Sequence, residues 1–156
     1  MQKASLFVAG ALALVPIAGL AADDHVAVTA DQLKWGPAPP AFPRGAEAAM
    51  LSGDPGKEGL YVIRIKTPAG YKVPAHTHPN DENVTIISGT FNFGMGSKLD
   101  EGKGTVLKAG SFFKAPKGMQ HYAWCSTDGP CIVQVHGMGP QTLNYVNPAD
   151  DPRKSN

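Results

Sequence analysis

The amino-acid sequence predicts an all-β domain, a sandwich or barrel of about ten antiparallel strands. Three observations support this fold class. Short apolar segments recur along the chain, several of them with a two-residue alternation. Residues with turn chemistry separate them, among 18 glycines and 14 prolines in 156 residues. No long segment shows the helical period.

The first segment, residues 1–22, is predicted to be a cleaved export signal. Lys3 gives a positive start, residues 6–20 are apolar, and Ala21 and Ala22 offer small side chains for cleavage. An apolar stretch of about 15 residues is shorter than the roughly 20 residues of a membrane-spanning helix, which disfavours a retained anchor. We expect a periplasmic or secreted protein that has no membrane attachment after cleavage near Ala21/Ala22.

Residues 23–45 are predicted to form an N-terminal arm. A short helical turn is expected near residues 29–34, and a proline-rich segment follows at residues 35–43. Because proline cannot donate to a ladder of hydrogen bonds, this segment cannot form an interior strand. We expect the arm to pack along the outside of a barrel or to lend an edge strand to a partner; a plain tether is the alternative.

Residues 46–147 are predicted to form the barrel, and residues 148–156 a C-terminal tail. Turn residues bound each strand candidate, and the loop at residues 94–104 is rich in glycine and charge. The predicted strands are 48–51, 60–67, 72–78, 82–88, 90–95, 105–108, 111–115, 120–126, 131–136 and 142–146.

Three histidines and a glutamate stand among turn glycines in two motifs. The motifs read Gly70-x5-His76-x-His78-x3-Glu82-x6-Gly89 and Gly110-x5-Pro116-x-Gly118-x2-His121. Strand alternation puts His76 and His78 on one face, roughly 6.5–7 Å apart, which is within reach of a single ion. A turn at residues 79–81 can bring in Glu82, and a closed sheet can return His121. Imidazole with carboxylate indicates a divalent transition metal rather than magnesium or calcium.

These motifs resemble the two motifs of the cupin superfamily, with Cys125 where the second motif ends in asparagine. The resemblance implies a cupin-type double-stranded β-helix, or jelly-roll barrel. It implies that His76, His78, Glu82 and His121 bind one iron, manganese or zinc ion. Residues 89–91 and 129–131 are also similar to the cupin half of zinc-dependent anti-sigma factors. The arm and the tail resemble those of small exported bacterial cupins.

The two cysteines, Cys125 and Cys131, flank a turn-rich loop. They are predicted to face each other across a hairpin and form a disulfide, which would contribute about 2–2.5 kcal/mol in the chain-entropy model. The alternative is that Cys125 points inward near the metal, as a fifth ligand or a reactive thiol.

Four further residues are candidates for a substrate pocket: Gln134, His136, Phe93 and Met119. Gln134 and His136 share one face of a strand and would contact substrate if that face looks into the barrel; otherwise His136 is a surface residue. Phe93 fits either the core or the mouth of a pocket. Met119 precedes the ligand His121 and is expected to border the pocket.

Balanced charge, 14 basic and 13 acidic residues, argues against nucleic acid and anionic membranes as partners. A divalent ion with three neutral imidazoles and one carboxylate keeps a net charge near +1 and open positions for a chelating small molecule. We therefore expect a metalloenzyme on a small oxygen-rich organic molecule, with an oxygenase favoured over an isomerase or lyase. The alternative is a non-catalytic metal or ligand sensor. A homodimer through edge strands is expected from the resemblance.

Overall fold

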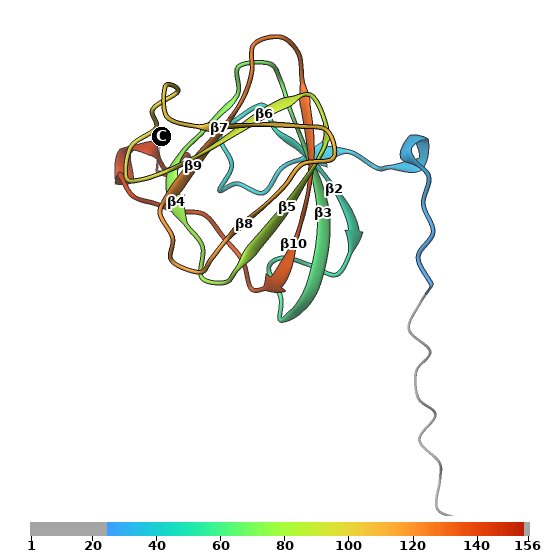
Figure 1. Ribbon diagram of the computed structural model, residues 1–156. Coiled ribbons are helices and arrows are strands. Elements are labelled where there is room, and N and C mark those ends of the chain that lie inside the picture. The colour runs from blue at the N-terminus through green and yellow to red at the C-terminus, as the bar shows by residue number, and fades with distance from the viewer. Residues whose placement is uncertain (1–24, 155–156) are drawn as a thin grey trace, which may run out of the picture.

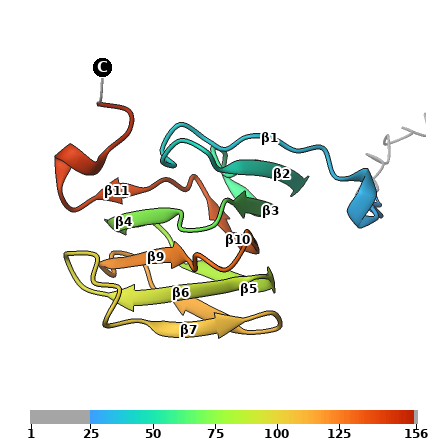
Figure 2. The same ribbon diagram turned by 90° about the horizontal axis from the view of Figure 1, so that it is seen from above.

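Two antiparallel sheets face each other in the computed structural model, which describes residues 25–154 (Figure 1). The predicted signal at residues 1–22 lies outside the described residues. Within residues 25–154, eleven strands form a six-stranded sheet of order β1-β2-β3-β10-β5-β8 and a five-stranded sheet of order β11-β4-β9-β6-β7. Figure 2 shows β4, β9, β6 and β7 following one another in that order. The predicted all-β class and jelly-roll architecture are confirmed.

The strand bounds lie close to those expected from the turn residues. β5, β6 and β7 agree with the prediction at both ends, and β10 extends three residues further. The strands are β1 (Gly36–Pro37), β2 (Glu47–Ser52), β3 (Gly59–Thr67), β4 (Lys72–Thr77), β5 (Glu82–Ser88), β6 (Thr90–Met95), β7 (Thr105–Lys108), β8 (Phe112–Ala115), β9 (His121–Cys125), β10 (Cys131–Gly139) and β11 (Asn144–Tyr145). Two 3-10 helices, η1 (Ala30–Gln32) and η2 (Pro148–Asp150), flank them.

Successive strands of the chain pass repeatedly from one sheet to the other, and the core lies between the two layers. On β3, alternation buries Tyr61, Ile63, Ile65 and Thr67 along the inner face. On the neighbouring strand β10 the buried members are its odd-numbered residues from 131 to 137. Because both sheets present their apolar rows inward, this two-sided core fixes the register of each strand.

The N-terminal arm is fastened to the barrel rather than hanging as a tether. β1 pairs with β2 at the edge of the chain's own six-stranded sheet, so the proline-rich segment is an edge strand, as its composition requires. Two tyrosine hydroxyls donate to arm carbonyls: Tyr71 to Pro43 at 2.6 Å and Tyr145 to Ala41 at 2.6 Å. The segment before β1, which contains η1, leads away from the barrel (Figure 1).

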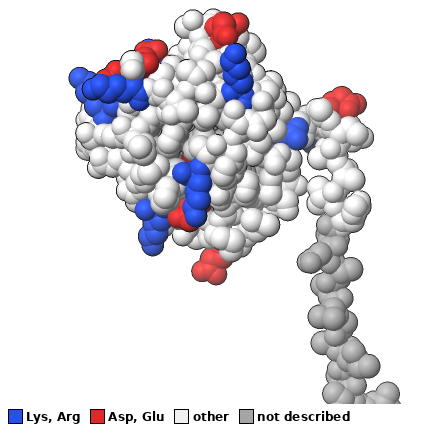
Figure 3. All heavy atoms as spheres, viewed as in Figure 1, with Lys and Arg blue, Asp and Glu red and all other residues white. Residues whose placement is uncertain are grey.

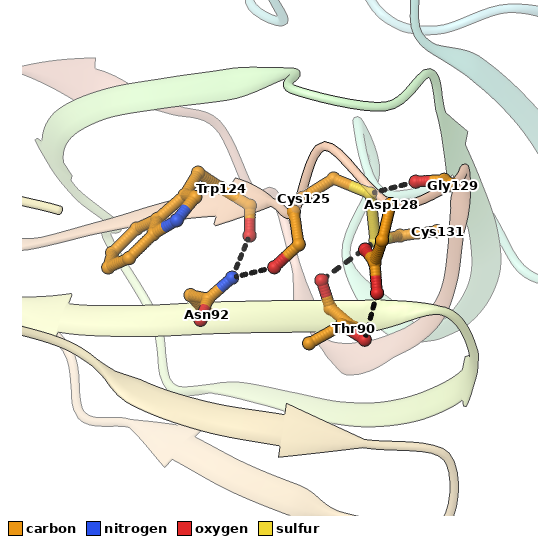
Figure 4. Close-up of a disulfide and its surroundings, with 8 residues drawn as sticks. Thr90, Asn92, Trp124, Cys125, Asp128, Gly129 and Cys131 are labelled. Carbon is orange, nitrogen blue, oxygen red and sulfur yellow. Dashed lines mark hydrogen bonds between the residues drawn. A yellow bond between two sulfur atoms is a disulfide. The ribbon is translucent and has the colours of Figure 1, made fainter.

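Cys125 and Cys131 form a disulfide, with the Cα atoms 5.8 Å apart (Figure 4). The expected hairpin is wrong. Cys125 ends β9 in the five-stranded sheet, whereas Cys131 begins β10 in the six-stranded sheet. The disulfide therefore ties the two sheets together, because the connecting loop crosses between layers. Cys125 is thus neither a free thiol nor a ligand in this structure.

Charged side chains are scattered over the surface. On the face drawn in Figure 3, lysine, arginine and acidic residues are interspersed on a mostly uncharged background. Several of the surface cations pair with acids, as Lys114 does with Asp81 at 2.6 Å. Among residues 25–154, no helix is long and apolar enough to cross a membrane.

Candidate metal centre

Three buried histidines meet on the inner face of the five-stranded sheet. His76 lies near the end of β4, His78 follows that strand, and His121 begins β9. β4 and β9 are neighbours, and His76 is the register partner of His121. The side chains of all three histidines offer ligand atoms within 4.8 Å of one another. The three histidines selected by their spacing in the sequence therefore lie close together in the fold, and they could hold a metal ion.

Glu82 reaches the histidines from the opposite sheet. It is the first residue of β5, and its Oε2 atom lies 3.4 Å from Nε2 of His78 and 3.7 Å from Nε2 of His121. The bend before it is held by Asp81, which accepts from the Lys117 backbone N–H at 2.8 Å. The bend at residues 79–81 thus carries the chain from one layer to the other, as predicted, and places the carboxylate across from the imidazoles.

Each histidine ring is oriented by a backbone carbonyl. The Nδ1 atoms lie 2.7 Å from the Pro74 oxygen for His76, 2.7 Å from the Thr142 oxygen for His78, and 3.0 Å from the Met119 oxygen for His121. A carbonyl oxygen only accepts, so each Nδ1 carries the hydrogen and donates it. The three Nε2 lone pairs are left for a ligand, which is the arrangement found around metal-binding histidines.

Burial and charge favour metal-binding protonation states at His76 and Glu82. Burial lowers the pKa of His76 to about 3, and repulsion from His121 and His78 adds to this effect. His76 is therefore the neutral imidazole that metals require. For Glu82, burial alone would raise the pKa, but electrostatic attraction to His78 and His121 holds it well below its usual range. The carboxyl group is thus ionised at neutral pH.

The contact between His78 and Glu82 fits a shared cation better than a direct pair. Burial opposes a charge on His78, yet the Glu82 carboxylate outweighs burial and raises the pKa of His78. At 3.4 Å, however, their closest contact is long for a charge-assisted hydrogen bond, and the Nε2 atom of His78 is buried without a close partner. Two ligands of one metal ion stand about 3.0–3.4 Å apart at bond lengths of about 2.1 Å. The arrangement of these side chains therefore fits a shared metal ion.

Two cavities meet at these side chains. An interior cavity with mainly apolar walls touches all four residues and extends into the barrel past Val73 and Phe91. An outer cavity of about 250 Å³ touches His78 and Glu82 and is bounded by Tyr61, Gln141 and the arm. Phe42 of the arm lines both cavities. A ligand at the histidines can therefore extend inward, outward or both ways.

Gln134 and His136 do not line either of these cavities, which corrects the expectation of a substrate contact. Val133 and Val135 are the β10 residues that face the interior cavity. Gln134 instead accepts a hydrogen bond from Arg64 Nε at 3.2 Å, on the outer side of the sheet. The apolar face of the strand turns inward because burying the valines excludes apolar surface from water. His136 lies on the same outer side of the sheet, as expected if this face of the strand does not look into the barrel.

Phe93 and Met119 lie beside the histidines rather than along the cavity walls. The Phe93 ring centroid is 5.5 Å from that of His121 and 4.2 Å from that of Phe113. Phe93 thus packs against a candidate ligand. Met119 contributes its backbone carbonyl, which orients His121. Both residues act on the position of His121, and neither offers a contact to a ligand in the cavities.

Sequence reasoning missed Tyr61 and Phe42 as neighbours of the site. Tyr61 is 1% exposed, and the negative charge of Glu82 acts on its hydroxyl, which adds to burial in raising the pKa of the phenol. The alternation along β3, which places Tyr61 among the inward-facing residues, could have identified it from the sequence. Phe42 carried no such signal, because only the folded arm brings a proline-rich segment over the barrel.

Comparison with known proteins finds a matching family model, similar sequences and similar solved structures. Residues 23–139 match the family model described as the ChrR Cupin-like domain. The chain is 31% identical over 128 residues to germin-like protein subfamily 2 member 1 of Arabidopsis thaliana, covering 76% of this chain and 58% of the plant protein. The polyketide cyclase RemF from Streptomyces resistomycificus superposes with a TM-score of 0.68 at 15% identity, covering 83% of this chain and 90% of that chain.

A second solved structure with a similar fold is a complex of two proteins. Rhodobacter sphaeroides SigE in complex with the anti-sigma ChrR gives a TM-score of 0.51 at 18% identity, covering 69% of this chain and 50% of that chain. At these identities, the structural likenesses show a shared fold. The chain spans less than two thirds of the length of the curated relatives it matches.

Proposed function

The chain belongs to the ChrR cupin-like family of the cupin superfamily, and from this premise we propose that it is an exported metal-dependent enzyme. Its substrate is a small oxygen-rich organic molecule, and oxygenase chemistry is favoured over isomerisation or elimination. The observation that carries the proposal is the convergence of three Nε2 lone pairs and one carboxylate on a point where two cavities meet.

The protein would hold the ion through His76, His78, His121 and Glu82. A divalent transition metal would supply Lewis acidity there and, as iron, one-electron chemistry with dioxygen. The backbone carbonyls behind the three imidazoles fix the rings, so that little reorganisation accompanies binding. Four protein ligands leave part of an octahedral shell to a chelating oxygen ligand.

The cavity walls favour a reaction that does not require a separate general base. Asp54 is the other carboxylate along the two cavities; one oxygen accepts from the Gly56 N–H at 2.8 Å and the other pairs with Lys57 at 3.4 Å. Burial and the charge of Glu82 raise the pKa of Tyr61, which keeps the phenol protonated. Tyr61 can therefore donate a hydrogen bond to a bound substrate but cannot abstract a proton at neutral pH.

Oxygen uptake by iron-loaded protein tests the proposed activity. The mature chain would be loaded anaerobically with ferrous iron and mixed with a panel of diols, thiols and phenolics in an oxygen-electrode cell. We expect substrate-dependent uptake that is lost in His121→Ala and retained in His136→Ala, a matched change at a surface histidine. Bound iron without uptake across the panel would count against oxygenase chemistry.

The second candidate is a non-catalytic metal or ligand sensor. It is favoured by the family match and by the fold shared with the anti-sigma ChrR. A sensor would bind its metal or ligand without turnover, and binding would change its surface. Tight binding of zinc with no reaction in the panel, accompanied by altered protection of surface amides in hydrogen exchange, would favour this function over the enzyme.

A further inference from the structure

The hydroxyl of Thr67 is a polar group without a partner inside the barrel. Thr67 is 4% exposed, and its Oγ1 atom has no hydrogen-bond partner within the described residues. It lies on the wall of the interior cavity, which also touches the candidate metal ligands. A buried hydroxyl left unpaired costs free energy, so a group that enters the cavity and hydrogen-bonds Oγ1 would be stabilised there.

Thr67 lies far along the barrel from the metal centre. It is the register partner of Cys131 on β10, whereas Glu82 is the register partner of Gly137 on the same strand. Six residues along a strand separate the two backbone positions by roughly 20 Å. Part of that length is taken up by the side chains that reach inward. A molecule that contacts both the ion and Thr67 must therefore lie lengthwise in the cavity.

The walls between the two ends are apolar. Ile65, Val73, Phe91 and Val133 line the cavity between Thr67 and the histidines. The interior cavity measures about 50 Å³, which is much smaller than the outer cavity of about 250 Å³. Such a space suits the apolar body of one small ring or short chain rather than an extended polar ligand. Polar groups on a ligand would therefore be satisfied at its two ends.

We propose that Thr67 is a specificity-determining residue that hydrogen-bonds the far end of the substrate, and this inference rests on the proposed function. The substrate class is a small, mainly apolar molecule with chelating oxygens at one end and a hydroxyl or carbonyl group at the other. A threonine hydroxyl both donates and accepts, so it matches either group. A site built to hydrogen-bond a substrate group discriminates strongly against analogues that lack it.

Paired hydroxamates test this assignment in the cobalt-loaded protein. Cobalt(II) reports ligand binding through its visible absorption, without turnover. Benzohydroxamate and 4-hydroxybenzohydroxamate share one chelating group and differ in a single hydroxyl at the opposite end. We expect the protein to bind the 4-hydroxy compound at least about tenfold more tightly. Thr67→Val should abolish that preference, and Thr67→Ser, which keeps the hydroxyl, should retain it.

The outcomes separate the inference from the proposed function. Spectral changes with equal affinity for both hydroxamates, or a preference that survives in Thr67→Val, would overturn the role of Thr67 while leaving the metal centre intact. If neither compound changes the spectrum of the cobalt protein, the proposed small-molecule site and the inference fail together.

Thermal unfolding of the metal-free protein gives a test that needs no ligand. Valine replaces the threonine hydroxyl with a methyl group of similar size, so an unpartnered hydroxyl predicts that Thr67→Val raises Tm by about 2–8 °C. Thr67→Ser should not raise it. A Tm that falls in Thr67→Val would show that the hydroxyl already has a partner in the free protein, and would overturn the inference.

Discussion

Zinc binding should stabilise the fold through the three histidines, by an amount set by the zinc affinity and the length of the domain. A ligand that binds only the folded state at 100 times its Kd adds about 2.7 kcal/mol to the free energy of unfolding. The described domain spans residues 25–154. At about 2.1 cal/mol/K per residue, a chain of that length has an unfolding entropy of about 0.27 kcal/mol/K. Saturation to this degree should therefore raise Tm by about 10 °C.

The assay is thermal unfolding of the metal-free protein, followed by circular dichroism across a zinc titration. Zinc serves as a redox-inert probe for the site. His121→Ala should lose most of the zinc-dependent rise. Because His121 is only 2% exposed, this variant also loses packing, so its Tm without metal should fall as well. The zinc-dependent difference in Tm, rather than the absolute Tm, is the quantity to compare.

A surface histidine provides the matched control. His136→Ala removes an imidazole from the outer side of β10 and should keep the full zinc-dependent rise. An equal rise in His121→Ala and in the unmodified protein would show that zinc binds elsewhere and would rule out the three-histidine site. So would the absence of any rise at zinc concentrations that saturate ordinary three-histidine sites.

Three more predictions address the fold around the site. Replacing Cys125 and Cys131 with alanine should lower the free energy of unfolding, measured in urea, by at least about 2.4 kcal/mol. The disulfide closes a short loop and joins the two sheets. Gly137→Ala should weaken zinc affinity, because its Cβ would stand 2.8 Å from a backbone carbonyl oxygen beside Glu82. Pairing with Arg153 lowers the pKa of Asp151. The contribution of this ion pair to the free energy of unfolding should therefore be present above about pH 3.8 and fade as pH falls.

Each of these predictions has a control and a contradicting result. For the disulfide, the reduced unmodified protein should match the double variant, and a loss under about 0.5 kcal/mol would contradict the loop argument. For the glycine, Gly129→Ala has open space around its Cβ and should leave zinc affinity unchanged. For the aspartate, Asp151→Asn should reduce the change in the midpoint of urea unfolding between pH 3 and 6. If the midpoint changes with pH to the same extent in the variant and in the unmodified protein, Asp151 is not a source of the pH dependence.

Strand positions were predictable because turn chemistry is local. Ser88 and Thr90 bound β5 and β6 on either side of Gly89, whose positive φ of 82° and close approach to the Pro130 carbonyl require glycine. The clustering of the three histidines was predictable for a related reason. Two-residue alternation and fixed spacing along a strand decide which side chains share a face.

Partnerships between strands were less predictable, because they depend on the whole topology. The cysteine loop has the composition of a hairpin, yet β9 and β10 lie in different sheets. Alternation divided β10 into two faces correctly, but it did not say which face looks into the barrel. The burial of Val133 and Val135 decides that, and it moves Gln134 outward. Phe42 lies beside the site because the arm folds against the barrel, and no local sequence pattern predicts that contact.

The metal content of the purified protein would show whether His76, His78, His121 and Glu82 hold one metal ion. The mature protein and His121→Ala would be purified anaerobically without added metal and analysed by mass spectrometry of the elements. We expect close to one equivalent of a divalent transition metal in the unmodified protein and a large loss in the variant. Iron or manganese would support oxygen chemistry, and zinc would favour the sensor or a lyase. No metal in either protein would contradict the assignment of the site.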